Sequence, residues 1–415
     1  MAIDLEALYT DLHRHPELSF QETRTAGIAA AHLRDLGLEV HEGVGVTGVV
    51  GVLRNPKRGQ GGEPAQASGP VVWLRADMDA LPVKEDTGLP YASTATGVDP
   101  DGHTVPVMHA CGHDMHVTAM IGAVERLVAD RAEWHGTVVV IIQPAEEFGA
   151  GARTMLDDGM LARFPRPDVV LGQHLTPLPA GVIGVRPGPQ MSASDGIQVV
   201  MHGRGGHGSR PHATIDPIVM AASTVMRLQT VVSREVDPRE LAVVTVGAIH
   251  AGTKNNIIPA DATLQLSLRY PDEALRDKVL EKVERVIRAE ALASGAEREP
   301  EISTLHTLPA TINDPDATAR VVAAFHEEFG EHAVVDPGLF TGSEDVSWFA
   351  RDAGAPLVFW FWGGIDPDDY RAAARAGTVD RDIPTNHSPF FAPVLHPTID
   401  VGVTAMTTAA RTFLG

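Results

Sequence analysis

Hydrophobic residues in the first part of the chain follow two alternating patterns. Apolar positions three and four residues apart predict helices, and continuous apolar runs predict strands that are buried on both faces. The stretch 55–70 is rich in Gly and Pro and predicts a surface loop without chemistry. The alternation predicts an α/β domain with helices at 4–14, 22–36 and 114–129 and strands at 46–53, 71–76, 138–143 and 169–174.

The pattern changes in the middle of the chain, where strands pair up between two longer helices. The order of the predicted elements is βαββαβ, which is the split pattern of a ferredoxin-like α+β domain. These elements are a strand at 196–203, a helix at 215–234, strands at 241–249 and 262–270, a charged helix at 273–294 and a strand at 301–305.

The first pattern resumes after about residue 307. It predicts a helix at 315–329, a short helix after Gly342, a strand at 356–363 and a final helix at 397–413. The polar stretch 365–382 is expected to be a mobile loop at the mouth of a pocket. We therefore predict a discontinuous α/β domain over 1–191 and 307–415, with a small α+β domain over 192–306 inserted in it.

Composition narrows the choice of partners. The 33 basic and 54 acidic residues give a net charge of −21, which argues against nucleic acid or an anionic membrane as a partner. The chain has neither an apolar run of the ~18 residues that a membrane span needs nor a basic, signal-like N-terminus. Cys111 is the only cysteine, so no intrachain disulfide can form, and we expect a cytoplasmic protein.

Two motifs rich in metal-binding side chains follow predicted strands or begin a predicted helix. Asp77 and Asp79 come directly after an apolar strand, although aspartates in a polar turn would look the same. Cys111 and His113 are two residues apart, and an extended Cys-x-His segment would aim thiolate and imidazole at one point. The alternative for this motif is a helix start that is merely rich in histidine.

Three further positions carry candidate chemistry. Glu146 and Glu147 follow a buried strand, so that one carboxylate can bind a metal while the other faces an activated water. Alone, the pair reads better as a surface pair opening a helix. Alone, His174 at the end of an apolar run reads better as a core histidine, and His387 in a Pro-rich loop as a surface residue.

Taken together, these positions favour a metal site. Five candidate ligands are too many for one tetrahedral zinc ion with an open position, but they suit two ions that share a bridging ligand and a water. The five are Cys111, His113, Glu147, His174 and His387.

Eight motifs, spanning residues 13 to 391, resemble one family in content and order: HRHPELSFQE, LRADMDALP, MHACGHDMH, QPAEE, GRGGHGSRPH, NNIIPA, TGSEDVS and TNHSPFF. The chain resembles the dinuclear metal-dependent aminoacylase and carboxypeptidase superfamily, in the branch of hippurate hydrolases, N-acyl-amino-acid amidohydrolases and auxin-conjugate hydrolases. It departs from many members in reading APVLHPT after the last motif, where they carry acidic residues. The resemblance implies a zinc-peptidase-like catalytic domain with an inserted lid and dimerisation domain.

The resemblance also implies roles for the candidate metal-site residues. Cys111 would bridge two divalent metal ions, His113 and His174 would complete one site, and Glu147 with His387 would complete the other. Zinc, manganese, cobalt and nickel all remain open as the metal. Glu146 would be the general base, and Asp79 would orient a ligand histidine.

In the inserted domain, the resemblance implies that His207 acts on the oxyanion from a neighbouring subunit and that Asn256 and Arg269 hold a substrate carboxylate. Glu344 would line the substrate pocket. The expected protein is a homodimer or higher homo-oligomer that hydrolyses the amide bond of a small N-acyl amino acid. A dipeptidase or small-peptide carboxypeptidase and a non-catalytic ligand-binding member remain alternatives, whereas a serine hydrolase is disfavoured because the chain has no G-x-S-x-G motif.

Overall fold

A computed structural model describes residues 2–57 and 69–415, so most of the predicted loop at 55–70 lies outside the described residues. The chain folds into two compact units. The first unit consists of Met1–Gln190, Ile312–Gly338 and Asp345–Gly415, and the second of Met191–Thr311 and Leu339–Glu344. Residues 307–311 and Leu339–Glu344 thus group with the second unit, although the predicted ranges assign them to the first. The reason is that the last strand of the second unit runs on to Leu308, and the main chain of Ser192 bonds to Phe340 and Gly342.

The first unit is built on a mixed sheet of eight strands in the order β1-β2-β6-β3-β7-β18-β8-β17. Strand β3 is parallel to both β6 and β7, and β7 is parallel to β18, whereas β2 runs antiparallel to β6. The central strands β6, β3 and β7 therefore end at the same edge of the sheet. The strands are β1 (Glu39–Val44), β2 (Gly48–Asn55), β3 (Val71–Asp77), β6 (Gly136–Gln143), β7 (Val169–Pro179), β8 (Ile183–Gly184), β17 (Val334–Val335) and β18 (Leu357–Ile365).

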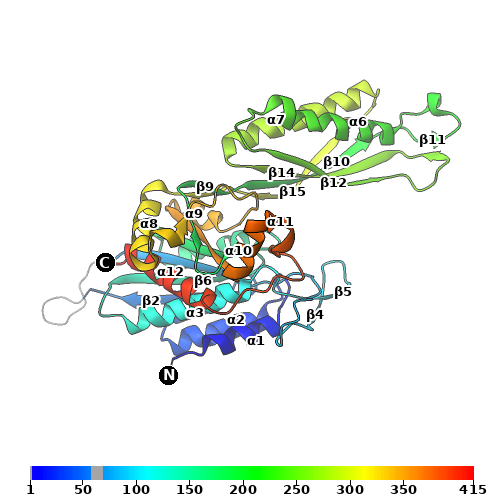
Figure 1. Ribbon diagram of the computed structural model, residues 1–415. Helices are drawn as coiled ribbons and strands as arrows, with labels where there is room; N and C mark the ends of the chain where they lie inside the picture. Colours follow the sequence, from blue (N-terminus) through cyan, green and yellow to red (C-terminus); the bar gives the residue numbers. More distant parts are fainter. Residues whose placement is uncertain (1, 58–68) are drawn as a thin grey trace. The chain divides into compact units, whose positions relative to one another are not determined.

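Helices cover both faces of this sheet (Figure 1). Helices α1 (Leu5–Arg14), α2 (Thr23–Asp35), α3 (His113–Ala129), α8 (Pro315–Phe329) and α12 (Thr398–Phe413) share the larger core on one face. Helices α4 (Gly151–Asp157) and α9 (Ser347–Ala353) pack on the other, where Phe349 meets Trp73 edge to face. Among the described residues, no helix has the length and apolar character needed to cross a membrane.

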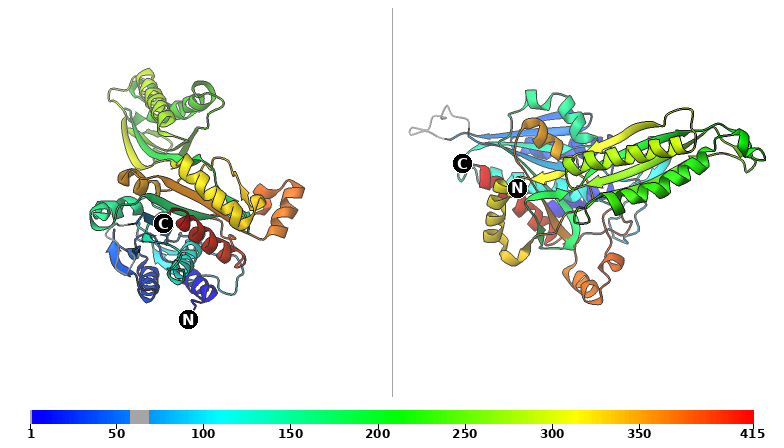
Figure 2. Two further views of the ribbon diagram at one scale, coloured as in Figure 1. Left: turned by 90° about the vertical axis from the view of Figure 1, so that its left-hand side faces the viewer. Right: turned by 90° about the horizontal axis from the view of Figure 1, so that it is seen from above.

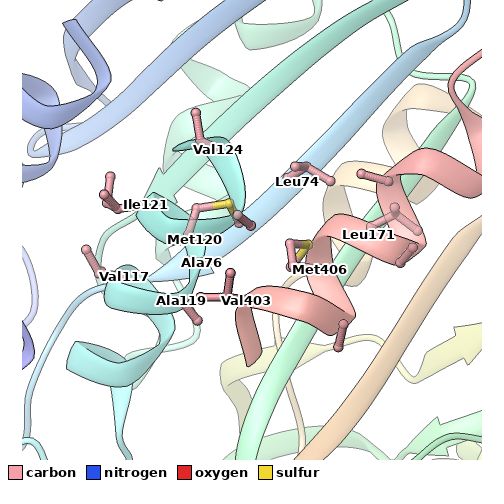
Figure 3. Packing of buried hydrophobic residues seen from close by; sticks show 14 of the residues in the cluster. Leu74, Ala76, Val117, Ala119, Met120, Ile121, Val124, Leu171, Val403 and Met406 are labelled. Carbon is pink, nitrogen blue, oxygen red and sulfur yellow. The ribbon is translucent and has the colours of Figure 1, made fainter. Parts of the chain in front are cut away.

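Helices α3 and α12 pack against each other and against the sheet around a layer of buried apolar side chains (Figure 3). Met120 of α3 and Met406 of α12 are fully buried in this layer, and burying a side chain of this size contributes about 1.5–3 kcal/mol. The residues labelled in Figure 3 belong to this core: Leu74, Ala76, Val117, Ala119, Met120, Ile121, Val124, Leu171, Val403 and Met406.

The second unit is a four-stranded antiparallel sheet in the order β12-β14-β10-β15, with α6 and α7 side by side on one face (Figure 2). The βαββαβ order and the ferredoxin-like fold class are confirmed. Helix α6 ends at Thr230, before the predicted residue 234, because the chain widens into a π-helical turn over Val231–Glu235. The elements are β10 (Ala193–His202), α6 (Pro217–Thr230), β12 (Val243–Ala251), β14 (Asp261–Tyr270), α7 (Glu273–Ala293) and β15 (Glu301–Leu308).

The prediction of a loop at 365–382 is wrong, because this stretch forms α10 (Pro367–Ala376) and α11 (Val379–Asp382). The side chain of Asp366 caps α10 by accepting hydrogen bonds from the backbone N–H groups of Asp368 and Asp369. Pro367 occupies the first turn and Gly377 ends the helix in the left-handed conformation. The start and stop signals were thus present in a segment whose polarity suggested a loop.

Candidate metal centre

Three adjacent strands bring their functional residues to one edge of the first sheet. Asp77 ends β3 and Asp79 follows it, and Glu146 and Glu147 follow β6. His174 lies in the middle of β7, just beyond the residues that pair with β3. Because β3 is parallel to both neighbours, segments that are distant in sequence meet here. Asp77, Asp79, Glu146 and His174 are buried, and the Glu147 side chain is only 9% exposed.

The segment Cys111-Gly112-His113, here called the CGH segment, does not have the extended geometry that we predicted from the sequence. Gly112 has φ +83° and forms the N-cap of α3, so Cys111 precedes a tight left-handed turn and His113 opens the helix. The left-handed conformation favours glycine at this position, and a Cβ there would also lie 2.8 Å from Leu175 Cδ2, so that the Leu175 side chain would have to move. The ligand atoms of Cys111, His113 and Glu147 nevertheless lie within 4.8 Å of one another.

His113 has one ring nitrogen occupied and the other without a hydrogen-bond partner. Its Nδ1 lies 3.2 Å from Asp79 Oδ1, which fixes the proton on Nδ1. Its Nε2 is buried without a partner and lies 3.9 Å from carboxylate oxygens of both Glu146 and Glu147. When the ring is neutral, the Nε2 lone pair in this buried position suits a metal ion.

Asp79 also holds the two glutamates in place. Its carboxylate accepts hydrogen bonds from the backbone N–H groups of Glu146 and Glu147 at 3.2 and 3.1 Å, and from Ser19 Oγ at 2.7 Å. The segment between β6 and these residues is strained, because Ala145 has φ +48°. One buried carboxylate therefore connects a histidine on α3 with the turn that presents Glu146 and Glu147.

His174 is oriented by its own strand. Its Nδ1 donates to the carbonyl of Leu175 at 2.7 Å, which leaves Nε2 unprotonated and 3.5 Å from Cys111 Sγ. Burial, helped by the neighbouring His116, holds the pKa of His174 well below its usual range. The ring is therefore neutral, as a metal ligand must be.

His387 lies on the open side of the cluster. Its Nε2 is 3.3 Å from Glu147 Oε1, and its side chain is 54% exposed, whereas the other four predicted ligands are at most 9% exposed. The residue has φ +69°, and its N–H donates to the carbonyl of Ala110, next to Cys111. The strained loop thus brings His387 from the end of the chain to the CGH segment, on the side where solvent has access.

The cluster carries excess negative charge around its nitrogen and sulfur atoms. Burial and the nearby carboxylates of Glu147 and Glu146 raise the pKa of the Cys111 thiol well above its ordinary value. Burial alone would lower the pKa of His113, but Asp77 and Asp79 raise it to about 10. A divalent cation would offset this charge. It could be bound by His113 Nε2, which has no hydrogen-bond partner, and by Glu147 Oε1, which has an ion-pair contact with His387 but no hydrogen bond. Thiolate, imidazole and carboxylate donors fit zinc and its neighbours in the first transition row.

A layer of charged residues lies beneath the cluster and was not predicted from the sequence. The guanidinium of Arg75 is completely buried and donates to Gln143 at 2.8 Å, to Asp77 at 2.6 Å and to Asp345 at 3.1 Å. Asp345 in turn accepts from Gln143 Nε2 and from the N–H of Ala152. An arginine inside an apolar strand was the available signal, since such a residue is almost never buried without partners.

Asn386 is a second contributor that was not predicted. Its amide nitrogen donates to the carbonyl of Cys111 at 3.2 Å and to that of Leu175 at 3.1 Å. It therefore connects the CGH segment, β7 and the His387 loop. Its place directly before His387 in TNHSPFF was the only signal that the sequence offered.

The four candidate residues of the second unit form two separate groups within the chain. His207 is exposed on a short ladder with Ile257, and Gly208 N–H donates to the Asn256 carbonyl. Arg269 instead lies near the other end of β14, where it bonds Ser343, the residue before the buried Glu344.

Arg269 and Asp261, at the two ends of β14, pair with Ser194 and His202 of β10. They are eight residues apart, roughly 27 Å at about 3.4 Å per residue. Because Asn256 precedes this strand, the structure does not bring Asn256 and Arg269 to one carboxylate within a single chain.

Comparisons with known proteins agree with this architecture. The family model described as peptidase family M20/M25/M40 matches residues 73–383. The chain is 37% identical to thermostable carboxypeptidase 1 of Saccharolobus solfataricus, over 85% of this chain and 84% of that protein. It is 38% identical to the hippurate hydrolase of Campylobacter jejuni, over 84% of this chain and 85% of that protein.

The fold is similar to that of a solved dinuclear metal-binding M20 peptidase from Bacillus subtilis. The TM-score is 0.76, with 30% sequence identity, and the match covers 98% of this chain and 96% of the other.

Proposed function

The chain belongs to peptidase family M20/M25/M40 and is an amide-bond hydrolase, and from this premise we propose that it cleaves N-acyl amino acids or related small conjugates such as hippurate. The observation that carries the proposal is the pair of glutamates fixed by Asp79 beside four nitrogen and sulfur donors. A carboxylate held next to a metal-ligand set is the arrangement that water activation requires.

In this proposal, Cys111, His113, Glu147, His174 and His387 would hold two divalent cations. When bound, the cations would polarise the substrate carbonyl and lower the pKa of an attacking water.

Glu146 takes the proton from that water and returns it to the leaving amine. The backbone hydrogen bond from Glu146 to Asp79 supports this role, because it fixes where the base lies relative to His113. Asp79 contributes by keeping the His113 proton on Nδ1.

We propose that His207 of a neighbouring subunit donates a hydrogen bond to the developing oxyanion. The N–H of Ser209 donates to His207 Nδ1 at 3.1 Å, so the ring proton lies on Nε2, which is the donor that this role needs. Asn256 would act together with His207, and Arg269 would bind the substrate carboxylate separately, with Glu344 in the pocket lining. This assignment requires a homodimer or a higher homo-oligomer.

Two alternatives use the same chemistry or the same fold. A carboxypeptidase or dipeptidase activity is favoured by the similarity to the thermostable carboxypeptidase and would differ only in the substrate pocket. A non-catalytic binding protein is disfavoured, because Glu146 and the complete ligand set are present. Zinc, manganese, cobalt and nickel are all compatible with the donors, and a cytoplasmic location remains our expectation.

The test is a screen of hippurate, N-acetyl amino acids and dipeptides against protein loaded with zinc, manganese, cobalt or nickel, with Glu146→Gln as the matched variant. We expect the unchanged protein to cleave at least one N-acyl amino acid faster than any dipeptide. Glu146→Gln should keep its metal content and lose about 10²–10⁴-fold in kcat. Cleavage of dipeptides alone would favour the carboxypeptidase alternative, and a near-normal rate in the variant would contradict the role of Glu146.

A further inference from the structure

We propose that Asp77 and His116 are positioning residues that hold His174 at the metal centre and are not metal ligands themselves. This inference rests on the proposed function, since it concerns the same centre. The competing possibility is real, because ligand atoms of Asp77, His113, His116 and His174 lie within 4.8 Å of one another and all four residues are buried. Three histidines and an aspartate at this spacing could themselves hold an ion.

The hydrogen bonds of His116 decide between the two possibilities. Its Nε2 accepts from the backbone N–H of Leu175 at 2.9 Å, so the ring proton must lie on Nδ1. Nδ1 faces Asp77 Oδ1 in a short hydrogen bond. Both nitrogens of the neutral ring are thus used inside the protein, and no lone pair remains for a cation.

The hydrogen bond between His116 and Leu175 positions the proposed metal ligand His174 through the main chain. The N–H that His116 accepts belongs to the peptide bond between His174 and Leu175. The carbonyl of Leu175 accepts from His174 Nδ1 at 2.7 Å and from Asn386 Nδ2 at 3.1 Å. The backbone on the C-terminal side of His174 is therefore held on both of its polar groups, which fixes the direction of Nε2 towards Cys111 Sγ.

The second carboxylate oxygen of Asp77 is also bonded within the protein. Its Oδ2 accepts from Arg75 at 2.6 Å, and Arg75 is completely buried and bonded to Gln143 and Asp345 as well. A buried carboxylate that is paired in this way has its charge compensated within the protein. Its distance from His113 Nε2, 3.7 Å, is longer than a hydrogen bond. The sequence of contacts runs from Arg75 through Asp77 and His116 to the main chain beside His174.

Two substitutions separate positioning from ligation. Asparagine at 116 can replace Nδ1 and keep the contact with Asp77, but its side chain is too short to reach Leu175 N–H. Glutamine at 116 can place an oxygen where Nε2 lies and keep the contact with Leu175. Loss of an outer partner of a metal site typically weakens metal binding or activity about 10–100-fold. His116→Asn should therefore weaken the binding of one of the two ions by this factor, whereas the metal affinities of His116→Gln should stay within a few-fold of those of the unchanged protein.

The experiment titrates Zn²⁺ and, separately, Mn²⁺ into the metal-free full chain and measures stoichiometry and both dissociation constants by competition with a chromogenic chelator. Met120→Ala is the matched control, because Met120 is buried on the same helix and belongs to the hydrophobic core. It should lower the unfolding temperature and leave both dissociation constants unchanged.

The positioning role of His116 would be supported by two results together. His116→Asn should still bind two ions per subunit, one of them about 10–100-fold more weakly, and His116→Gln should bind both ions with near-normal affinity. Loss of a whole ion in His116→Gln would identify His116 as a ligand and overturn the proposal, even if His116→Asn did not fold. Unchanged binding in a folded His116→Asn would overturn it as well. The proposed function fails separately, if the unchanged protein binds no ions and cleaves no amide.

Discussion

Replacing Asp79 with Asn tests how much of the metal centre depends on one buried carboxylate. Asp79 is 1% exposed, and its two oxygens serve four donors. Oδ1 receives His113 Nδ1 and the N–H of Glu146, and Oδ2 receives Ser19 Oγ and the N–H of Glu147. Asparagine has nearly the same shape and offers only one oxygen, so the substitution changes hydrogen bonding and charge without creating a cavity.

The expected magnitude follows from these contacts. With its oxygen in the place of Oδ1, asparagine still accepts from His113 and Glu146. Its amide nitrogen then faces Ser19, whose hydroxyl can turn to accept, and the N–H of Glu147, which cannot. One unpaired buried donor costs about 1–3 kcal/mol of folding free energy. Removing the charge beside His113 should also weaken one metal about 10–100-fold, which corresponds to roughly 1.4–2.8 kcal/mol.

The assay combines urea unfolding of the metal-free protein with metal titration and steady-state hydrolysis of an N-acyl amino acid. Ser19→Ala is the matched control, because it removes one donor from the same carboxylate and leaves its charge and its three other contacts in place. We expect the control to lose about 1 kcal/mol of stability and to keep its metal affinities. Metal affinities in Asp79→Asn equal to those of Ser19→Ala would refute the orienting role of Asp79.

Two further predictions concern the buried His13 and the removal of the metal ions. Burial alone would lower the pKa of His13, but hydrogen bonds to Asp114 at 2.6 Å and Glu85 at 3.1 Å raise it to about 10. This pKa lies above the value near 6.5 that His13 has in the unfolded chain. At about 1.36 kcal/mol per pKa unit, the protonated side chain therefore contributes up to roughly 5 kcal/mol to the free energy of unfolding. This contribution should be complete below pH 6.5 and should be lost as the pH rises towards 10. Urea unfolding across this range should show a flatter decline for His13→Gln, and parallel declines would contradict the assignment. Chelation of the metals should abolish turnover and lower the unfolding temperature, since an ion at 100 times its dissociation constant contributes about 2.7 kcal/mol, and re-addition should restore both. Turnover that persists in protein verified to be metal-free would argue against a metal centre.

The pattern of apolar residues was sufficient for most of the fold. Strands β3, β6 and β7 are buried on both faces and therefore appear as continuous apolar runs, and the βαββαβ order of the second unit follows from local spacing alone. The pattern failed at 365–382, where a polar surface helix has few buried positions and only its caps identify it. It also missed short strands such as β8 and β17, whose pairing depends on distant partners.

The sequence by itself determined which residues can bind a metal, because motif content and order depend on side-chain chemistry and not on conformation. Cys111, His113, Glu146, Glu147 and His174 were all chosen in this way, and the structure brings them to one edge of the sheet. The shared edge was expected, because these segments lie at the carboxyl ends of parallel strands.

Only the tertiary structure decided how each of these groups is held. The left-handed turn at Gly112, the proton on His113 Nδ1 and the separation of Asn256 from Arg269 depend on contacts between segments far apart in the chain. The same holds for His116, which stands in the same motif as His113 and has the same side chain. One histidine keeps a partnerless nitrogen and the other has both nitrogens bonded, because their partners come from other strands whose positions the local sequence does not specify.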